Sequence, residues 1–69
     1  MYQAVLHRIS VKATVTLTTR GMRRIVGQGE AEWAPFALND AIEDAYTKLY
    51  DFDGLPHDVE VIKLEANVE

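Results

Sequence analysis

The feature that most constrains the fold is an alternation of apolar and polar residues near the N-terminus. From Arg8 to Thr18 every even position is polar. The odd positions are apolar or aromatic over a run of seven: Val5, His7, Ile9, Val11, Ala13, Val15 and Leu17. A period of two is typical of a strand with one face on a core and one in water. It predicts a strand from about Tyr2 to Thr18, roughly three times the usual ~5–6 residues. A strand of this length bends or projects beyond its own domain, which suggests a partner.

A turn and a second strand are expected next. The segment Thr19–Met22 contains Gly21, which can supply the positive φ of a tight hairpin. In the returning segment five residues share one face: Ile25, Gly27, Gly29, Ala31 and Trp33. Pro35 has no amide donor and suits the first turn of a helix, so the second strand ends before it.

The second half of the chain has a helical period followed by another alternation. Apolar residues recur at steps of three and four and predict an amphipathic helix of about four turns: Leu38, Ala41, Ile42, Ala45, Leu49 and Phe52. A turn follows at Asp53–Pro56. In the last segment the apolar parity changes between Val61 and Ile62. Either a β-bulge lies there or the strand is apolar on both faces.

These elements predict one α+β domain over residues 1–69 with ββαβ order. The hairpin makes the first two strands antiparallel. A right-handed crossover through the helix returns the chain so that the third strand lies beside the first. We therefore expect a three-stranded, antiparallel-rich sheet of order 2-1-3, with one helix on one face.

The small size of the chain favours self-association. A domain of 69 residues buries only about 60% of the surface that its unfolded chain exposes, so its stability is marginal. Cysteine is absent and the two histidines have no zinc spacing, so we expect neither disulfides nor a metal site. Oligomerisation is the remaining common way to stabilise such a domain.

Composition narrows the class of partner. A net charge of −4 argues against binding nucleic acid through its phosphates. No apolar run approaches the ~20 residues of a membrane span, and Met1–Ala4 does not resemble the start of a signal peptide. We expect a cytoplasmic protein with no membrane partner, no nucleic-acid partner and no cofactor.

Five residues are candidates for ligand binding: Arg23, Arg24, Gly27, Gly29 and Trp33. The two glycines lack the third glycine of a dinucleotide fingerprint and the lysine of a P-loop. They mark a bulge, close packing under the helix, or a ligand site lined by backbone. The tryptophan packs in a core or an interface, or stacks on a planar ligand.

The basic residues around the turn leave two readings open. Together with Arg20, the two candidate arginines either hold a carboxylate or phosphate, or pair with Glu30 and Glu32 of the same hairpin or of a neighbour. His7 has the apolar parity of its strand, which favours a buried imidazole over a general base.

Four features follow one another in the chain: Gly21, Gly27-Gln-Gly29, Trp33-Ala-Pro and the expected helix Phe36–Tyr46. This stretch resembles the allosteric dimerisation domain of isopropylmalate and citramalate synthases. The resemblance covers about half of that domain, and the catalytic barrel of those synthases is absent. Glu32 and Trp33 stand where the family commonly has an acidic residue after the second glycine. The resemblance implies a regulatory or assembly module that pairs through its sheet or helix and binds a small carboxylate at the seam.

The sequence contains no catalytic constellation, so the leading hypothesis is a non-enzymatic, homo-oligomeric module, a dimer or larger. Small-molecule binding at a subunit interface is an additional role in this hypothesis. The alternative is an adaptor that binds a larger protein through an exposed edge strand. An enzyme that uses His7 or the arginine cluster ranks third, because one helix on three strands rarely encloses a pocket.

Overall fold

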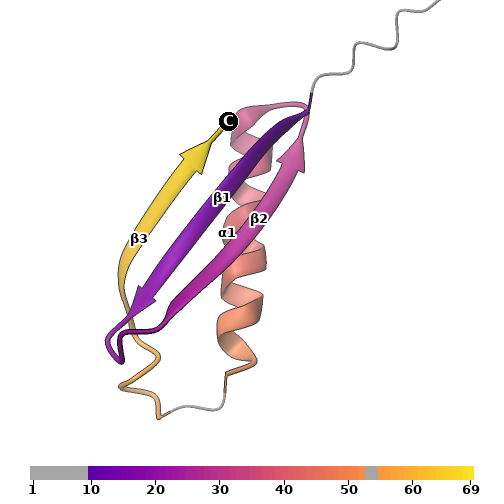
Figure 1. The fold of residues 1–69 in the computed structure, drawn as a ribbon. Coiled ribbons are helices and arrows are strands. Elements are labelled where there is room, and N and C mark those ends of the chain that lie inside the picture. The colour runs from indigo at the N-terminus through magenta and orange to yellow at the C-terminus, as the bar shows by residue number, and fades with distance from the viewer. Residues whose placement is uncertain (1–9, 53–54) are drawn as a thin grey trace, which may run out of the picture.

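The protein forms a three-stranded sheet with one helix packed on one face (Figure 1). The computed structural model describes residues 10–52 and 55–69. Its elements are β1 (Val11–Thr19), β2 (Arg24–Ala31), α1 (Ala34–Tyr50) and β3 (Val61–Val68). The predicted α+β, ββαβ fold is confirmed. The N-terminal half of the predicted first strand, with His7, lies outside the described residues.

The most regular strand lies in the centre of the sheet. The strand order is β2-β1-β3, and β1 is antiparallel to both neighbours. Val15, for example, lies opposite Gly27 on one side and Ala66 on the other. The predicted order 2-1-3 is therefore confirmed.

A β-bulge explains the change of parity in the last strand. Thr18 lies opposite Lys63, but Thr19 lies opposite Val61, so Ile62 is an extra residue on β3. One extra residue reverses the facing of everything beyond it. Of the two interpretations left open by the sequence, the bulge near Val61 and Ile62 is the one that the structure has.

The hairpin between β1 and β2 corrects one prediction. The residue with positive φ is Met22, at 63°, and not Gly21. A Cβ on Gly21 would lie 3.0 Å from the Asp58 carbonyl oxygen, to which its own N–H donates over 3.0 Å. The glycine therefore permits close contact with the loop before β3. The buried Thr19 supports the turn, because its Oγ1 accepts from the Arg23 N–H over 3.1 Å.

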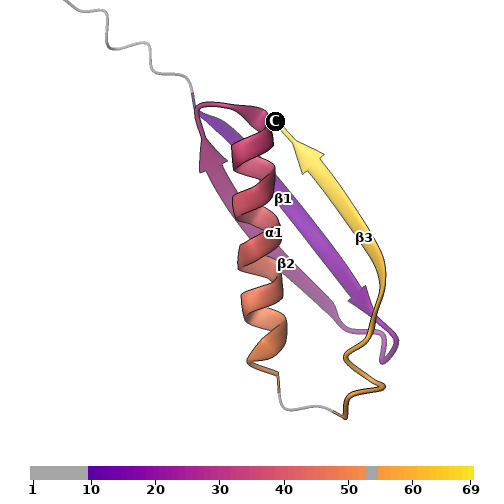
Figure 2. The same ribbon diagram turned by 180° about the vertical axis from the view of Figure 1, so that it is seen from behind.

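The core lies between α1 and the β2–β1 half of the sheet. The helix buries every fourth residue: Ala37, Ala41, Ala45 and Leu49. The strands contribute Ala13, Val15, Leu17 and Ile25. Three of the predicted core positions of the helix are therefore confirmed. Leu38 and Ile42 are partly buried and pack against this core, whereas Phe52 lies beyond the end of α1 and is 37% exposed. Seen from behind, α1 crosses β1 and β2 and leaves β3 to one side (Figure 2).

Candidate functional site: the outer edge of β3

The outer edge of β3 has unpaired backbone groups. Beyond the end of β3, the Glu69 N–H donates to the Lys12 carbonyl over 2.8 Å. Residues of an antiparallel strand alternate between bonding to a neighbour and pointing away from it. In the register that places Asn67 opposite Thr14 and Glu65 opposite Thr16, the odd residues of β3 bond to β1. The even residues Leu64, Ala66 and Val68 consequently point their N–H and C=O groups outward. Within residues 10–52 and 55–69, no strand pairs with this edge.

The same three residues carry apolar side chains on the helix side of the sheet. They lie opposite Leu17, Val15 and Ala13, which are all buried. Leu64 is nevertheless 45% exposed and Val68 43% exposed, because the helix does not cover this strand. Ile62 in the bulge is 49% exposed. We call Leu64, Ala66 and Val68, with their outward backbone groups, the β3 edge.

The opposite edge of the sheet is blocked by the helix. The Asp44 carboxylate accepts from the Gln28 N–H over 2.9 Å, and the Lys48 ammonium donates to the Val26 carbonyl over 2.9 Å. Lys48 also lies 3.1 Å from Asp44. The hydrogen bond from Gln28, followed by that from Lys48, lowers the pKa of the Asp44 carboxyl. Side chains that occupy the groups of an edge strand prevent it from pairing with another chain. The two edges of the sheet therefore differ in their capacity to accept a strand.

The two candidate glycines lie directly under the helix. A Cβ on Gly27 would lie 2.3 Å from both the Ala41 carbonyl oxygen and the Ala45 nitrogen. A Cβ on Gly29 would lie 2.2 Å from the Ala37 carbonyl oxygen. Only glycine allows a helix to approach a strand this closely. Of the interpretations left open by the sequence, close packing under the helix accounts for both residues.

The three other candidates lie at opposite ends of β2. Arg23 is at the hairpin, where its guanidinium carbon lies 4.7 Å from the centroid of the Phe52 ring. Arg24 is exposed at the start of β2, whereas Trp33 precedes α1 beyond the other end and is 64% exposed. The length of β2 that separates them is roughly 25 Å at ~3.3 Å per residue. The structure does not bring these residues together within one chain, and as ligand-binding residues all five stay a prediction.

Arg20 forms its ion pair outside the hairpin. Its Nε lies 3.0 Å from Glu60 Oε1, and this hydrogen bond lowers the pKa of Glu60 and raises that of Arg20. Glu30, one of the two carboxylates expected to pair with the arginines, lies opposite Lys12 at the far end of β2. The ion pair with Glu60 instead connects the hairpin to the segment before β3.

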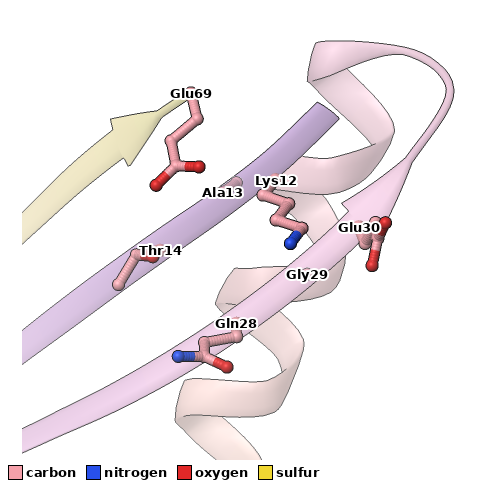
Figure 3. A pocket seen from close by; sticks show the side chains of 7 residues that line it. All are labelled: Lys12, Ala13, Thr14, Gln28, Gly29, Glu30 and Glu69. Atoms are coloured by element: carbon pink, nitrogen blue, oxygen red, sulfur yellow. The ribbon is translucent and has the colours of Figure 1, made fainter. Parts of the chain in front are cut away.

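A shallow hollow of about 430 Å³ lies on the face of the sheet away from the helix (Figure 3). Its lining is Lys12, Ala13, Thr14, Gln28, Gly29, Glu30 and Glu69. One ammonium group and two carboxylates share this surface, so it concentrates no single sign of charge. In the described part of the chain, no cluster of three or more histidine or acidic residues has the arrangement of a metal site.

No helix among the described residues has the length and apolar character needed to cross a bilayer. Comparison with protein-family models gives no match, and neither curated proteins nor solved structures match the chain significantly.

Sequence reasoning did not single out the β3 edge. The signal was present, because Ile62, Leu64, Ala66 and Val68 form an apolar series in the last strand. An alternating pattern predicts a buried face, however, and does not reveal that a single helix is too narrow to cover three strands.

Proposed function

We propose that this chain is a small, non-enzymatic assembly module that forms homo-oligomers. The observation that carries the proposal is the β3 edge, where outward backbone groups and half-exposed apolar side chains coincide. The other edge is capped by Asp44 and Lys48, so a partner strand has one favoured place to bind.

The energetics of a small domain support the same proposal. Full burial of a leucine or valine side chain contributes about 1.5–3 kcal/mol relative to exposure. Leu64 and Val68 have realised only about half of this gain, since 45% and 43% of their surfaces remain exposed. A second subunit over the edge recovers the remainder and stabilises a domain whose own core is small.

A regulatory role is the finer part of the proposal. The resemblance to the synthase dimerisation domain implies a small carboxylate bound where subunits meet, and a cytoplasmic location stays a separate prediction. Small-molecule binding stays a prediction, since Arg23 and Arg24 lie far from Trp33 within one chain.

An adaptor is the second candidate, and the β3 edge favours it as well. An exposed strand edge with apolar side chains accepts an extended segment of another protein by strand addition. The two candidates differ in what occupies the edge of the purified protein alone, which is a second copy for the assembly module and water for the adaptor.

The test is the solution mass, measured by light scattering on a sizing column over a concentration series. The chain has a mass of 7.8 kDa, and the assembly module predicts at least twice this value at micromolar concentration. Leu64→Lys places a charge on the β3 edge and should shift the protein towards monomer. Val26→Lys is the matched control, because Val26 is 42% exposed on the capped strand, and it should leave the mass unchanged. A wild-type monomer at all concentrations would refute the assembly module and favour the adaptor.

A further inference from the structure

We propose that the partner on the β3 edge is a second copy of this chain, paired antiparallel about a two-fold axis at Ala66. The two sheets then join into one of six strands, with both helices on the same face. This inference rests on the proposed function, because it specifies the interface through which the module assembles.

The backbone limits the register of such a pair. Opposite residues must both direct their N–H and C=O groups outward, which on this edge restricts hydrogen-bonded pairs to Leu64, Ala66 and Val68. With the axis at Ala66, this residue faces its own copy and Leu64 faces the partner's Val68. All three outward residues of each chain are then hydrogen-bonded, and the paired segment begins after the bulge at Ile62.

Two registers shifted towards the bulge are less favourable. An axis at Glu65 would place two carboxylates directly opposite each other, and like charges in that position are destabilising. An axis at Leu64 would bring the irregular backbone at Ile62 opposite the partner's Ala66. The regular segment from Lys63 to Glu69 is used in full only when the axis lies at Ala66.

The side chains are complementary in this register. On the face away from the helix, Lys63 lies opposite the partner's Glu69, and Glu65 lies opposite the partner's Asn67. Within one chain Lys63 Nζ is 3.6 Å from Glu65 Oε2, so the ammonium gains a second carboxylate on pairing. On the helix side, Leu64 packs against the partner's Val68 on either side of the small Ala66. Each contact occurs twice by symmetry.

The absence of cysteine allows a direct test with single-cysteine variants of the full chain. Opposite residues of a hydrogen-bonded antiparallel pair have Cα atoms about 5.5 Å apart, which is within the range of a disulfide. Ala66→Cys should therefore give a covalent dimer under mild oxidation, seen on a non-reducing gel. Leu64→Cys and Glu65→Cys report the two registers shifted towards the bulge and should cross-link at least severalfold more slowly. Gln28→Cys on the capped strand is the control and should not cross-link above the background of random collision.

The outcomes separate this inference from the function on which it rests. A wild-type dimer by mass, together with fastest cross-linking at position 66, supports both. A dimer that cross-links faster through position 28, 64 or 65 overturns the proposed register but leaves self-assembly standing. A monomer that cross-links at none of these positions overturns both.

A charge exchange gives a second test that needs no cysteine. Lys63→Glu should weaken the dimer by about three- to tenfold, because it places like charges opposite each other twice. Adding Glu69→Lys should restore the affinity, although it leaves Glu65 beside the new carboxylate within the same chain. Failure of the second substitution to restore dimerisation would overturn the register.

Discussion

Replacing Gly29 with alanine should destabilise the domain through a clash between backbones. The added Cβ would lie 2.2 Å from the Ala37 carbonyl oxygen and 2.5 Å from the Ala41 nitrogen, whereas ordinary contacts begin at 3.4 Å. Neither atom belongs to a side chain that can rotate away, so α1 must retreat by roughly 1 Å. Such overpacking costs about 1–3 kcal/mol, and two backbone clashes place this site at the upper end.

Part of this cost is offset in the unfolded chain. Replacing glycine with alanine restricts the unfolded ensemble and contributes about 0.4–1 kcal/mol of stability. The net expectation is a loss of about 2 kcal/mol in the free energy of unfolding. A domain of this length has only roughly 3–10 kcal/mol in total, at ~0.05–0.15 kcal/mol per residue.

The assay is urea unfolding followed by circular dichroism at a fixed protein concentration. Gln28→Ala is the matched control, because this neighbour on β2 is exposed, and it should change the free energy by less than about 0.5 kcal/mol. If Gly29→Ala is as stable as the wild type or more so, the close packing of helix and strand is wrong.

Two further predictions concern the turn and the capped edge. Met22→Gly should stabilise the domain by up to about 1 kcal/mol. Met22 has a φ of 63°, which costs L-residues about 1–2 kcal/mol, and little packing is lost because its side chain is 76% exposed. A lower urea midpoint for the variant would contradict this. Asp44→Asn should lower stability at pH 7 and have less effect at pH 3. The folded pKa of Asp44 is depressed, so its contribution is present above the unfolded pKa of about 3.9 and is lost as the pH falls through the folded value. Glu43→Gln is the control, because it makes the same change of charge one residue away. If the loss of stability in Asp44→Asn is the same at both pH values, the ionisation of Asp44 does not stabilise the domain.

The sequence was sufficient for the architecture because each element had a period of its own. The alternation through β1 and the three- and four-residue steps of α1 predicted a strand and a helix, and the hairpin with a right-handed crossover predicted the strand order; the structure agrees with all three. The change of parity at Ile62 left a bulge as one of two interpretations, and the structure has the bulge.

The turn was harder to predict because two features that each favour glycine, a positive φ and a close backbone contact, fall on neighbouring residues. Gly21 is next to the residue with positive φ, but contact with Asp58 accounts for the glycine. Sequence proximity does not show which of two neighbouring residues adopts the left-handed conformation, nor that a loop 37 residues further along approaches the turn.

The candidate site was the least predictable part. The sequence indicated Arg23, Arg24 and Trp33 as candidates, but the two arginines lie at the other end of β2 from the tryptophan. It did not indicate Leu64 and Val68. Their exposure depends on where α1 crosses the sheet. Gly27 and Gly29 set that position, because they let the alanine face of α1 pack closely on β2, so that the helix does not cover β3.

Coverage of the β3 edge by a second copy of this chain can be tested by amide hydrogen exchange of Leu64, Ala66 and Val68, followed by NMR at two protein concentrations. These three outward amides should exchange slowly, and their protection should increase with concentration, because pairing is bimolecular. Exchange as rapid as in an open loop at both concentrations would show that no second copy pairs with this edge.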